Sequence, residues 1–545
     1  MNPRSAADAL HGPVSVVVIA YNDAEHLSTA VTSALAQGEA VGEVIVVDDC
    51  STDGTGALAD RLAAASPRVR ALHRPENSGG CGTPRNDGIR AARGSWVAFL
   101  DSDDELPSGA VEALLRAAER NRADVAAGLC MRVELPDGRR MPWQPKLFAQ
   151  AQVFDGLRRR TETVWDTLSV NKLYRRDFLL EEGITFPDGA AHYEDFTFSA
   201  RVYAASPRFA VVPDTVYLWY SRPSARTPSI SLRRDRIGNW TDRLAAHTGA
   251  LDALRAAGQD ELVRATELKF AAYDVPMYLR DLHRRSADYR EQWWSATRRH
   301  LAGFSTDWQA AADLPTRWRA AVLRDREQPE PGDLLRLAEL SAEPPRLSPP
   351  YAGDAARPLW DDRSPRVTLD PPGAPGAAAS AGTAAVTGLP LCVTAAVRPG
   401  RLLRFQLRLD DLHGLAAAAG PESVRLLLVH RVRGTEIAEE AVWSPAPAGG
   451  GWTAEASVPL LSMHARSDAI EPWDAFAEIR FRDGGRLRTK VRAGAGVGRT
   501  AALTSRGVLL VQPYATTDNS LAVRTTDGLS GGRRVLRNRI DRLRR

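Results

Sequence analysis

Short apolar runs alternate with helical patterns through the first third of the chain. Four of these runs are continuous enough to be buried strands: Val14–Ala20, Glu43–Val47, Val69–His73 and Trp96–Leu100. Amphipathic stretches of about 12 residues, typical of surface helices, separate them. Continuous apolar strands joined by such helices indicate a parallel sheet that is covered on both faces. The pattern therefore predicts an α/β, Rossmann-like domain.

Further elements follow these four runs. Ser108–Asn121 has the pattern of a helix capped by its serine, and Asp124–Val133 has that of a strand. From about residue 232 to residue 340 the pattern is helical. Three later segments alternate apolar and polar residues: Leu402–Leu409, Val424–Val429 and Ala475–Phe481. Such alternation predicts strands of a β-sandwich-like module.

These changes divide the chain of 545 residues into five expected regions. They are an α/β domain at 1–230, a helical region at 231–345, a Pro/Ala/Gly-rich linker at 346–385, a β-rich, immunoglobulin-like module at 386–530 and a basic tail at 531–545. The composition of Asp370–Ala385 cannot bury a core, which is typical of a linker.

Composition and charge exclude several classes of protein. The 71 basic and 67 acidic residues leave a net charge of +4, which is too even for a nucleic-acid-binding surface. Four scattered cysteines form no zinc or disulfide pattern and fit a reducing compartment. The first apolar run is far shorter than the roughly 20 residues that span a bilayer. We therefore expect a cytoplasmic protein, either soluble or peripheral at the inner face of the membrane.

Polar motifs follow the predicted strands, at the edge where open α/β sheets bind ligands. Ala20, Tyr21 and Asn22 come after the first strand, where an aromatic ring can stack on a flat base. Asp49 comes after the second strand, where a carboxylate can accept hydrogen bonds from a base and a ribose. Residues 51–54 follow it and are better explained as a turn and a helix cap.

Two more motifs follow the third and fourth strands. The glycine-rich loop that begins at Asn77 leads into a helix and can cradle an anion, and Arg85 offers a fork to phosphate. The fourth strand is followed by Asp101, Ser102 and Asp103. Two carboxylates at this spacing can hold a hard divalent cation. An acidic turn is the alternative for one such motif, but the order of all four favours a site.

The order AYN, VVDDxSTDGT, NxGxxxxRNxGI and FLDSDD resembles glycosyltransferase family 2, on the GT-A fold, over residues 13–230. The resemblance implies that Asp49 binds the nucleotide, that Arg85 approaches the base or diphosphate, and that Asp101 and Asp103 hold Mn²⁺ or Mg²⁺. It implies a nucleotide-sugar site formed by Ala20, Tyr21, Asn22, Asp49, Asn77, Arg85, Asp101 and Ser102.

The segment His192–Phe196 resembles the ED motif of the same family. The resemblance implies that Asp195 is the general base of an inverting transfer and that Glu194 orients it or binds the acceptor. A carboxylate beside the acceptor hydroxyl would take its proton as the anomeric carbon is attacked. An acidic pair at a helix start is the alternative. Lys172 is either structural or an acceptor contact, while Arg222 and Ser229 are candidate phosphate contacts.

The order of regions resembles the bacterial enzymes that glycosylate wall teichoic acid. This resemblance implies a UDP-sugar donor, a cell-envelope polymer or lipid-linked precursor as an anionic acceptor, and a homotrimer formed through the C-terminal module. The arginine-rich tail Arg533–Arg545 suits an anionic partner such as an acidic membrane surface. A solvated tail without a partner is an equal alternative.

Two other function classes compete with a glycosyltransferase. A nucleotidyltransferase needs a glycine-rich loop with Arg and Lys near the first strand, which the AYNDAEH segment lacks. A non-catalytic, polymer-binding protein with a decayed domain is opposed by an intact set of candidate residues: Asp49, Arg85, Asp101, Asp103 and Asp195.

Overall fold

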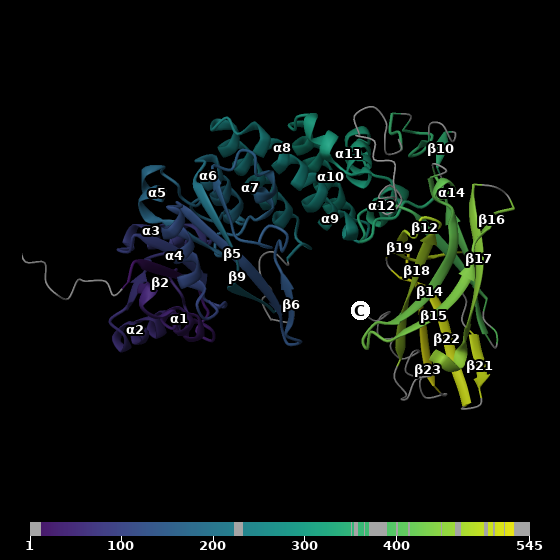
Figure 1. Cartoon of the computed structure of the whole chain (residues 1–545), viewed down its shortest axis with the longest axis horizontal. Helices are drawn as coiled ribbons and strands as arrows, with labels where there is room; N and C mark the ends of the chain where they lie inside the picture. The colour runs from purple at the N-terminus through teal and green to yellow at the C-terminus, as the bar shows by residue number, and fades with distance from the viewer. Residues whose placement is uncertain are drawn as a thin grey trace, which may run out of the picture. The chain divides into compact units, whose positions relative to one another are not determined.

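The computed structural model describes residues 12–222, 233–349, 351–353, 358–364, 366–369, 390–398, 400, 402–412, 415–447, 450–463, 470–494, 500–504, 507–516 and 518–527. The chain divides into two compact units, Met1–Phe270 and Ala271–Arg545 (Figure 1). The division falls inside the stretch where the sequence pattern is helical.

The first unit is built on one mixed sheet. Its described strands are β1 (Val14–Ala20), β2 (Val41–Asp48), β3 (Val69–His73), β4 (Trp96–Asp101), β5 (Val125–Glu134), β6 (Arg139–Pro142), β7 (Gln152–Asp155), β8 (Lys172–Arg175) and β9 (Arg208–Ser221). The strand order is β3-β2-β1-β4-β8-β5-β9-β7, with β6 paired to β5. Strands β1 to β4 are parallel, as expected. The sheet as a whole is mixed, because β8 is inserted antiparallel between β4 and β5.

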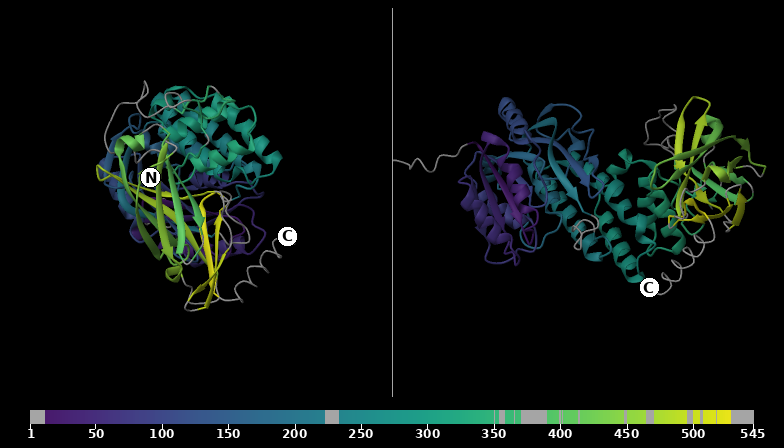
Figure 2. Two further views of the ribbon diagram at one scale, coloured as in Figure 1. Left: turned by 90° about the vertical axis from the view of Figure 1, so that its right-hand side faces the viewer. Right: turned by 90° about the horizontal axis from the view of Figure 1, so that it is seen from below.

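Helices pack on this sheet (Figure 2). They are α1 (Leu27–Leu35), α2 (Thr55–Ala65), α3 (Gly82–Ala91), α4 (Ala110–Asn121), α5 (Arg176–Glu181) and α6 (Glu194–Ala204). Two further helices, α7 (Ile237–Ala256) and α8 (Asp260–Lys269), form another layer, in which α7 packs on α6 and α8 packs on α7. Every side chain of β1 and β2 is buried, which explains their continuous apolar runs. Ser108 does not cap α4: the cap position is Gly109, in a left-handed conformation and without a side-chain hydrogen bond.

Helix α3 lies unusually close to strand β1. A Cβ atom added at Gly88 would lie 2.2 Å from Cγ1 of Val17, so only glycine permits this approach. Gly88 is one turn after Arg85, whose side chain is nearly inaccessible to solvent. The close contact therefore fixes the height of Arg85 above the end of the sheet.

Helix α7 belongs to the first unit and packs along α6. The Thr197 hydroxyl donates to the carbonyl oxygen of Ala246 at 3.2 Å. A Cβ at Gly249 would lie 2.8 Å from that hydroxyl, so the two helices meet across a glycine. The unit that contains the sheet therefore includes helices beyond residue 230.

The second unit contains helices and two β-sheets. Its principal helices are α9 (Val275–Leu282), α10 (Ala287–Ala302), α11 (Leu314–Asp325) and α12 (Pro331–Leu340). One sheet has the order β16-β17-β13-β12-β20, from Ser444–Pro445, Gly451–Pro459, Leu402–Asp410, Cys392–Arg398 and Arg492–Ala493. The other has the order β15-β14-β18-β23-β22-β21, from Glu436–Val442, Pro421–His430, Glu471–Phe481, Leu521–Asp527, Gly507–Ala515 and Thr500–Thr504, with β19 (Arg486–Lys490) paired to β18. The three expected strands are present; a sandwich-like packing of the two sheets stays a prediction.

Part of the expected linker at 346–385 packs into the second unit. The side chains of Trp360 and Leu369 are fully buried, and the Trp360 indole donates to Asp333 at 2.8 Å. The described part of this segment therefore contributes to a core. Residues 370–385 and the basic tail at 531–545 lie outside the described residues. In the part of the chain that the structure describes, no helix is both long and apolar enough to cross a membrane.

Candidate functional site

The candidate residues gather at the carboxyl ends of the parallel strands. In the register of the sheet, Ala20 lies opposite Asp48 on β2, and Ile19 lies opposite Asp101 on β4. Strands β1, β2 and β4 therefore end side by side and bring three of the sequence motifs to one edge. Two clusters form there, one around Asp49 and one around Arg85.

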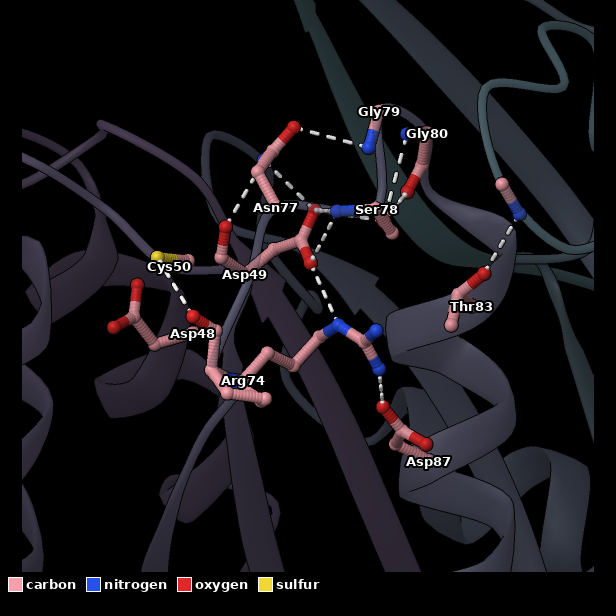
Figure 3. Close-up of polar contacts among 12 residues, drawn as sticks. Asp48, Asp49, Cys50, Arg74, Asn77, Ser78, Gly79, Gly80, Thr83 and Asp87 are labelled. Carbon is pink, nitrogen blue, oxygen red and sulfur yellow. Dashed lines mark hydrogen bonds and ion pairs between the residues drawn. The ribbon is translucent and has the colours of Figure 1, made fainter.

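The Asp49 cluster orders the glycine-rich loop (Figure 3). One carboxylate oxygen of Asp49 accepts from the Ser78 hydroxyl at 2.8 Å and from the Asn77 amide at 3.0 Å. The Ser78 backbone N–H lies 3.1 Å from both carboxylate oxygens, and Nε of Arg74 forms an ion pair with the other oxygen at 2.8 Å. Arg74 also pairs with Asp87 on α3. The loop is therefore fixed by one buried carboxylate.

The AYN motif divides into structural and exposed residues. Ala20 is buried, and its carbonyl oxygen accepts from the Asp49 backbone N–H at 2.9 Å. The Asn22 side-chain oxygen accepts from the Thr52 backbone N–H at 2.7 Å, which holds the turn after β2. Tyr21 is 51% exposed at the strand end. Of the three, Tyr21 has the side chain that remains available to a ligand.

The Arg85 cluster brings together motifs that are far apart in the sequence. The Arg85 guanidinium is buried and donates through Nη2 to Asp101 at 2.7 Å. Its Nη1 donates to Glu194 at 2.5 Å and to Asp195 at 3.4 Å. The side chain thus joins three carboxylates, and this geometry favours a positioning role over an open phosphate contact.

Three carboxylates around one guanidinium leave an excess of negative charge. Burial raises the pKa of Glu194 to about 7, with repulsion from Asp195 adding to the shift and Arg85 opposing it. Burial also raises the pKa of Asp195, although the Ser169 hydroxyl stabilises the carboxylate by donating to it at 2.7 Å. Raised carboxyl pKa values in a partly buried cluster are typical of proton-transfer sites.

The DxD carboxylates remain partly open to solvent. The side chains of Asp101 and Asp103 are 34% and 44% exposed. Burial and the charge of Asp101 raise the pKa of Asp103 to about 6, while Nη1 of Arg222 donates to its carboxylate at 3.2 Å. The Ser102 hydroxyl points to Asp23, to which it donates at 2.7 Å, so it is already engaged.

A divalent cation is chemically compatible with this pair. Two accessible carboxylates that repel each other supply hard oxygen donors and unbalanced negative charge. Among the residues that the structure describes, no group of three His, Cys, Asp or Glu side chains forms a complete metal site. A cation held here would therefore need further oxygen ligands, which the phosphates of a donor can supply.

Several contacts at this edge were not predicted. The Tyr217 hydroxyl donates to the buried Asp104 at 2.8 Å and accepts from the Asp101 backbone N–H at 3.2 Å. Ser169 and Asp23 likewise bind predicted residues. Tyr217 lies in the segment that ends at Arg222, where only the arginine was taken as a candidate, and Ser169 lies in a loop without a motif. The acidic run 101–104 was the available signal for Asp104.

Lys172 has a structural role. Its ammonium group is buried and donates to Asp166 at 2.6 Å and to the Leu168 carbonyl oxygen at 2.5 Å. This buried ion pair fixes the chain around β8. Arg222 lies beside Asp103, where a phosphate contact stays a prediction, and Ser229 lies outside the described residues.

Known proteins are similar to this chain in sequence and in fold. Residues 15–182 match the profile of Glycosyl transferase family 2. The succinoglycan biosynthesis protein ExoO of Rhizobium meliloti is 34% identical over 263 residues, which cover 46% of this chain and 73% of ExoO. The chain belongs to glycosyltransferase family 2.

The poly(ribitol-phosphate) beta-N-acetylglucosaminyltransferase TarS of Staphylococcus aureus is also related. It is 30% identical to this family 2 chain over 210 residues, which span 38% of the chain but only 35% of TarS. The crystal structure of S. aureus TarS matches with a TM-score of 0.51 at 18% identity and covers 95% of this chain and 86% of TarS. TarS 1–349 in complex with UDP-GlcNAc matches with a TM-score of 0.50 at 21% identity, over 64% of this chain and 97% of that one. At these identities the structures support the fold alone.

Proposed function

We propose that the chain is an inverting glycosyltransferase that moves a sugar, a hexose or N-acetylhexosamine, from a UDP-sugar to a cell-envelope polymer such as teichoic acid or to a lipid-linked precursor. The observation that carries this proposal is the Arg85 cluster. One guanidinium holds Asp101 of the DxD motif and both acidic residues of the ED motif. The carboxylate proposed for the diphosphate end and the carboxylates proposed for the acceptor hydroxyl are therefore held by the same guanidinium.

The nucleotide occupies the Asp49 side of the sheet edge in this proposal. Tyr21 offers its exposed ring to the base, and the loop ordered by Asp49, Asn77 and Ser78 forms the wall of the site. A loop that is fixed before binding lowers the entropy lost when the donor binds.

Asp101 and Asp103 would hold Mn²⁺ or Mg²⁺ beside the diphosphate. When bound, this cation supplies positive charge that stabilises the departing UDP. Arg85 holds the Asp101 carboxylate in place from one side, and Arg222 holds Asp103 from the other. The two arginines keep the carboxylates apart and oriented.

Asp195 acts as the general base. Its carboxylate accepts the proton of the acceptor hydroxyl while the oxygen attacks the anomeric carbon. The bond between that carbon and the phosphate oxygen breaks, and UDP leaves with the electron pair. Ser169 and Arg85 orient the carboxylate, and Glu194 shares Arg85 with it. Glu194 can also contact the acceptor.

The names of the relatives support a polymer acceptor. TarS is named for poly(ribitol-phosphate), and ExoO is named for succinoglycan biosynthesis. The phosphates in the name poly(ribitol-phosphate) make that polymer anionic, and the name succinoglycan denotes a glycan. We extend to this chain a polymeric or lipid-linked, anionic acceptor, and we further propose a cytoplasmic location and assembly into trimers through the C-terminal module at 386–530.

A donor panel tests the proposal. Purified full-length chain is titrated with UDP-, GDP- and TDP-sugars in the presence and absence of Mn²⁺, and transfer to poly(ribitol phosphate) is measured. We expect metal-dependent binding of a UDP-sugar. Asp195→Asn should reduce transfer to a small residual rate and keep donor binding, whereas Asp103→Asn should weaken donor binding. Glu112→Gln, on the exposed face of α4, is the matched control and should change neither. Absence of metal-dependent donor binding would overturn the proposal.

A further inference from the structure

The backbone just before the acidic pair has an uncommon conformation. Tyr193 is the residue before α6 and has φ of 60°, in the left-handed region that aromatic residues rarely adopt. Glu194 and Asp195 form the first turn that follows it. Such a conformation persists only where the surroundings stabilise it. The direction in which the two carboxylates leave the helix therefore depends on what holds Tyr193.

Helix α7 holds Tyr193. The tyrosine hydroxyl donates to the Asn239 side-chain oxygen at 3.0 Å. The Arg243 guanidinium carbon lies 4.3 Å from the centre of the Tyr193 ring, well within cation–π range. Asn239 and Arg243 are one turn apart on α7, and both are at most 6% exposed. A cation–π contact is strongest when the cation is desolvated, as it is here.

The contacts that α7 makes with Tyr193 belong to a larger set, called the brace below, which also holds the residue on the other side of the acidic pair. Arg243 lies 5.2 Å from the centre of the Phe196 ring, and Nζ of the buried Lys269, at the end of α8, lies 4.2 Å from it. On the preceding side, His192 pairs with Asp242 of α7 at 2.6 Å. Residues on both sides of Glu194 and Asp195 are thus held by α7 and α8.

This brace differs from the contacts of the carboxylates themselves. Arg85 and Ser169 bind the ends of the two acidic side chains. The contacts from α7 hold the aromatic residues on either side and so the backbone from which the carboxylates project. Because the side chain of Asp195 is short, a shift of that backbone moves its carboxylate oxygens with it.

The geometry points to Arg243 and Asn239 as positioning residues for Asp195, acting through Tyr193 and Phe196. This inference rests on the proposed role of Asp195 as general base. A base must lie about 2.6–3.2 Å from the oxygen whose proton it takes, and a displacement of about 1 Å can cost roughly 100-fold in rate. Helix α7 is therefore a functional part of the transferase, beyond the motifs of the sheet edge.

Kinetics of the full-length chain test this role. The probes are poly(ribitol phosphate) and UDP-N-acetylglucosamine, or the UDP-sugar with the highest turnover in the donor panel. Arg243→Met should lower kcat by about 10- to 100-fold and leave KM for the donor within about twofold. Arg243→Lys keeps the cation and should recover much of the loss. Thr248→Ala, at an exposed position on the same helix, is the matched control and should behave as the unaltered chain.

A double-variant cycle separates positioning from general destabilisation. Asp195→Asn should lower kcat strongly without removing the turnover that donor binding and the cation still support, so single-turnover assays with excess enzyme measure what remains. In this background Arg243→Met should cause no further loss of that residual turnover, because the base that it positions is absent. An equal loss in both backgrounds, or an unchanged kcat for Arg243→Met, would overturn the inference. If Arg243→Met does not fold, Tyr193→Phe decides: it removes only the hydroxyl bond to Asn239, and an unchanged kcat would also contradict the inference.

The same experiment distinguishes the two proposals. Full transfer by Asp195→Asn alone contradicts the general-base role and with it the proposed function. Loss of transfer in Asp195→Asn together with a normal kcat in both Arg243→Met and Tyr193→Phe contradicts only the positioning role of α7.

Discussion

The two clusters at the sheet edge are opposite in their electrostatics. Around Asp49, one buried carboxylate receives amide, hydroxyl and guanidinium donors, so its charge is satisfied by the protein. Around Arg85, one guanidinium faces three carboxylates, so the cluster has negative charge in excess. The Asp49 cluster is therefore held rigidly by its own hydrogen bonds. In the Arg85 cluster the carboxylates repel one another, and binding of a cation or a proton reduces this repulsion.

This difference suggests a division of labour. A satisfied carboxylate changes little when ligand binds, which suits recognition of a nucleotide. An unbalanced cluster is sensitive to metal and pH, which suits the reacting end of the donor. Four experiments test this contrast between the two clusters.

The largest effect is expected from Arg85→Met. The substitution leaves three carboxylates without their shared cation, and breaking a buried ion cluster in this way costs about 3–5 kcal/mol. We expect that loss in the free energy of unfolding, measured by urea denaturation, and transfer below detection. Arg90→Met, one turn further on α3 and 60% exposed, is the control and should cost under about 0.5 kcal/mol. Equal effects of both variants would refute the contrast.

Asp49→Asn should have the next largest effect. The amide cannot accept all the bonds from Asn77, Ser78 and Arg74, and unsatisfied buried donors cost about 1–3 kcal/mol. We expect a lower melting temperature and about tenfold weaker donor binding by calorimetry, since 1.4 kcal/mol is a factor of ten. Asp137→Asn, in an exposed turn, is the control and should change neither. Undiminished donor binding would show that the Asp49 cluster is not the nucleotide wall.

Glu194→Gln should change how stability depends on pH. The pKa of Glu194 is about 7 in the folded chain, above its ordinary value of 4.5. A raised carboxyl pKa means that stability is complete below the unfolded pKa and is lost as pH rises through the folded pKa. Between pH 5 and pH 8 the free energy of unfolding of the unaltered chain should fall by on the order of 1–3 kcal/mol more than that of the glutamine variant. Urea denaturation in metal-free buffer measures this, and parallel pH profiles would contradict it.

The smallest effect is expected from metal. Mn²⁺ with UDP should raise the melting temperature by a few degrees, because a ligand stabilises the state that it binds. Asp103→Asn should remove this rise. The pKa of Asp103 is about 6, so protons compete with the metal, and the rise should be smaller at pH 5.5 than at pH 7.5. An equal rise at both pH values would indicate that Asp103 does not hold the cation.

Local pattern was sufficient for the strands and for the strand-end motifs. Strand β1 has the predicted bounds, because a continuous apolar run bounded by polar residues has few other solutions. Strand β3 also has the predicted bounds, although Arg70 and His73 leave it only partly buried. The antiparallel β8 was not predicted, because it is short and its alternation is weak. Its position depends on the buried pair of Lys172 with Asp166, a tertiary contact that periodicity does not reveal.

The partners of the motif residues were harder to predict. The sequence motif around Arg85 predicted a contact with phosphate. The motif does not reveal the carboxylates that occupy the guanidinium, because these lie up to 110 residues away in the sequence. Tyr193 lies inside the ED segment but was given no role there, and Arg243 belongs to no motif. Their role follows from the packing of α6 on α7, which depends on a glycine at position 249 and on a left-handed residue, features of backbone geometry that residue type alone does not specify.

Gly88 has a consequence for how this transferase can vary. It has no functional group, yet it sets how closely α3 approaches β1, and α3 carries Arg85. A methyl group there would push the helix outward and draw the guanidinium away from three acidic partners at once. Such a substitution would appear in a genetic screen as loss of transfer from a position remote from any substrate. Gly88 therefore controls the alignment of the Arg85 cluster, although it takes no part in the reaction itself.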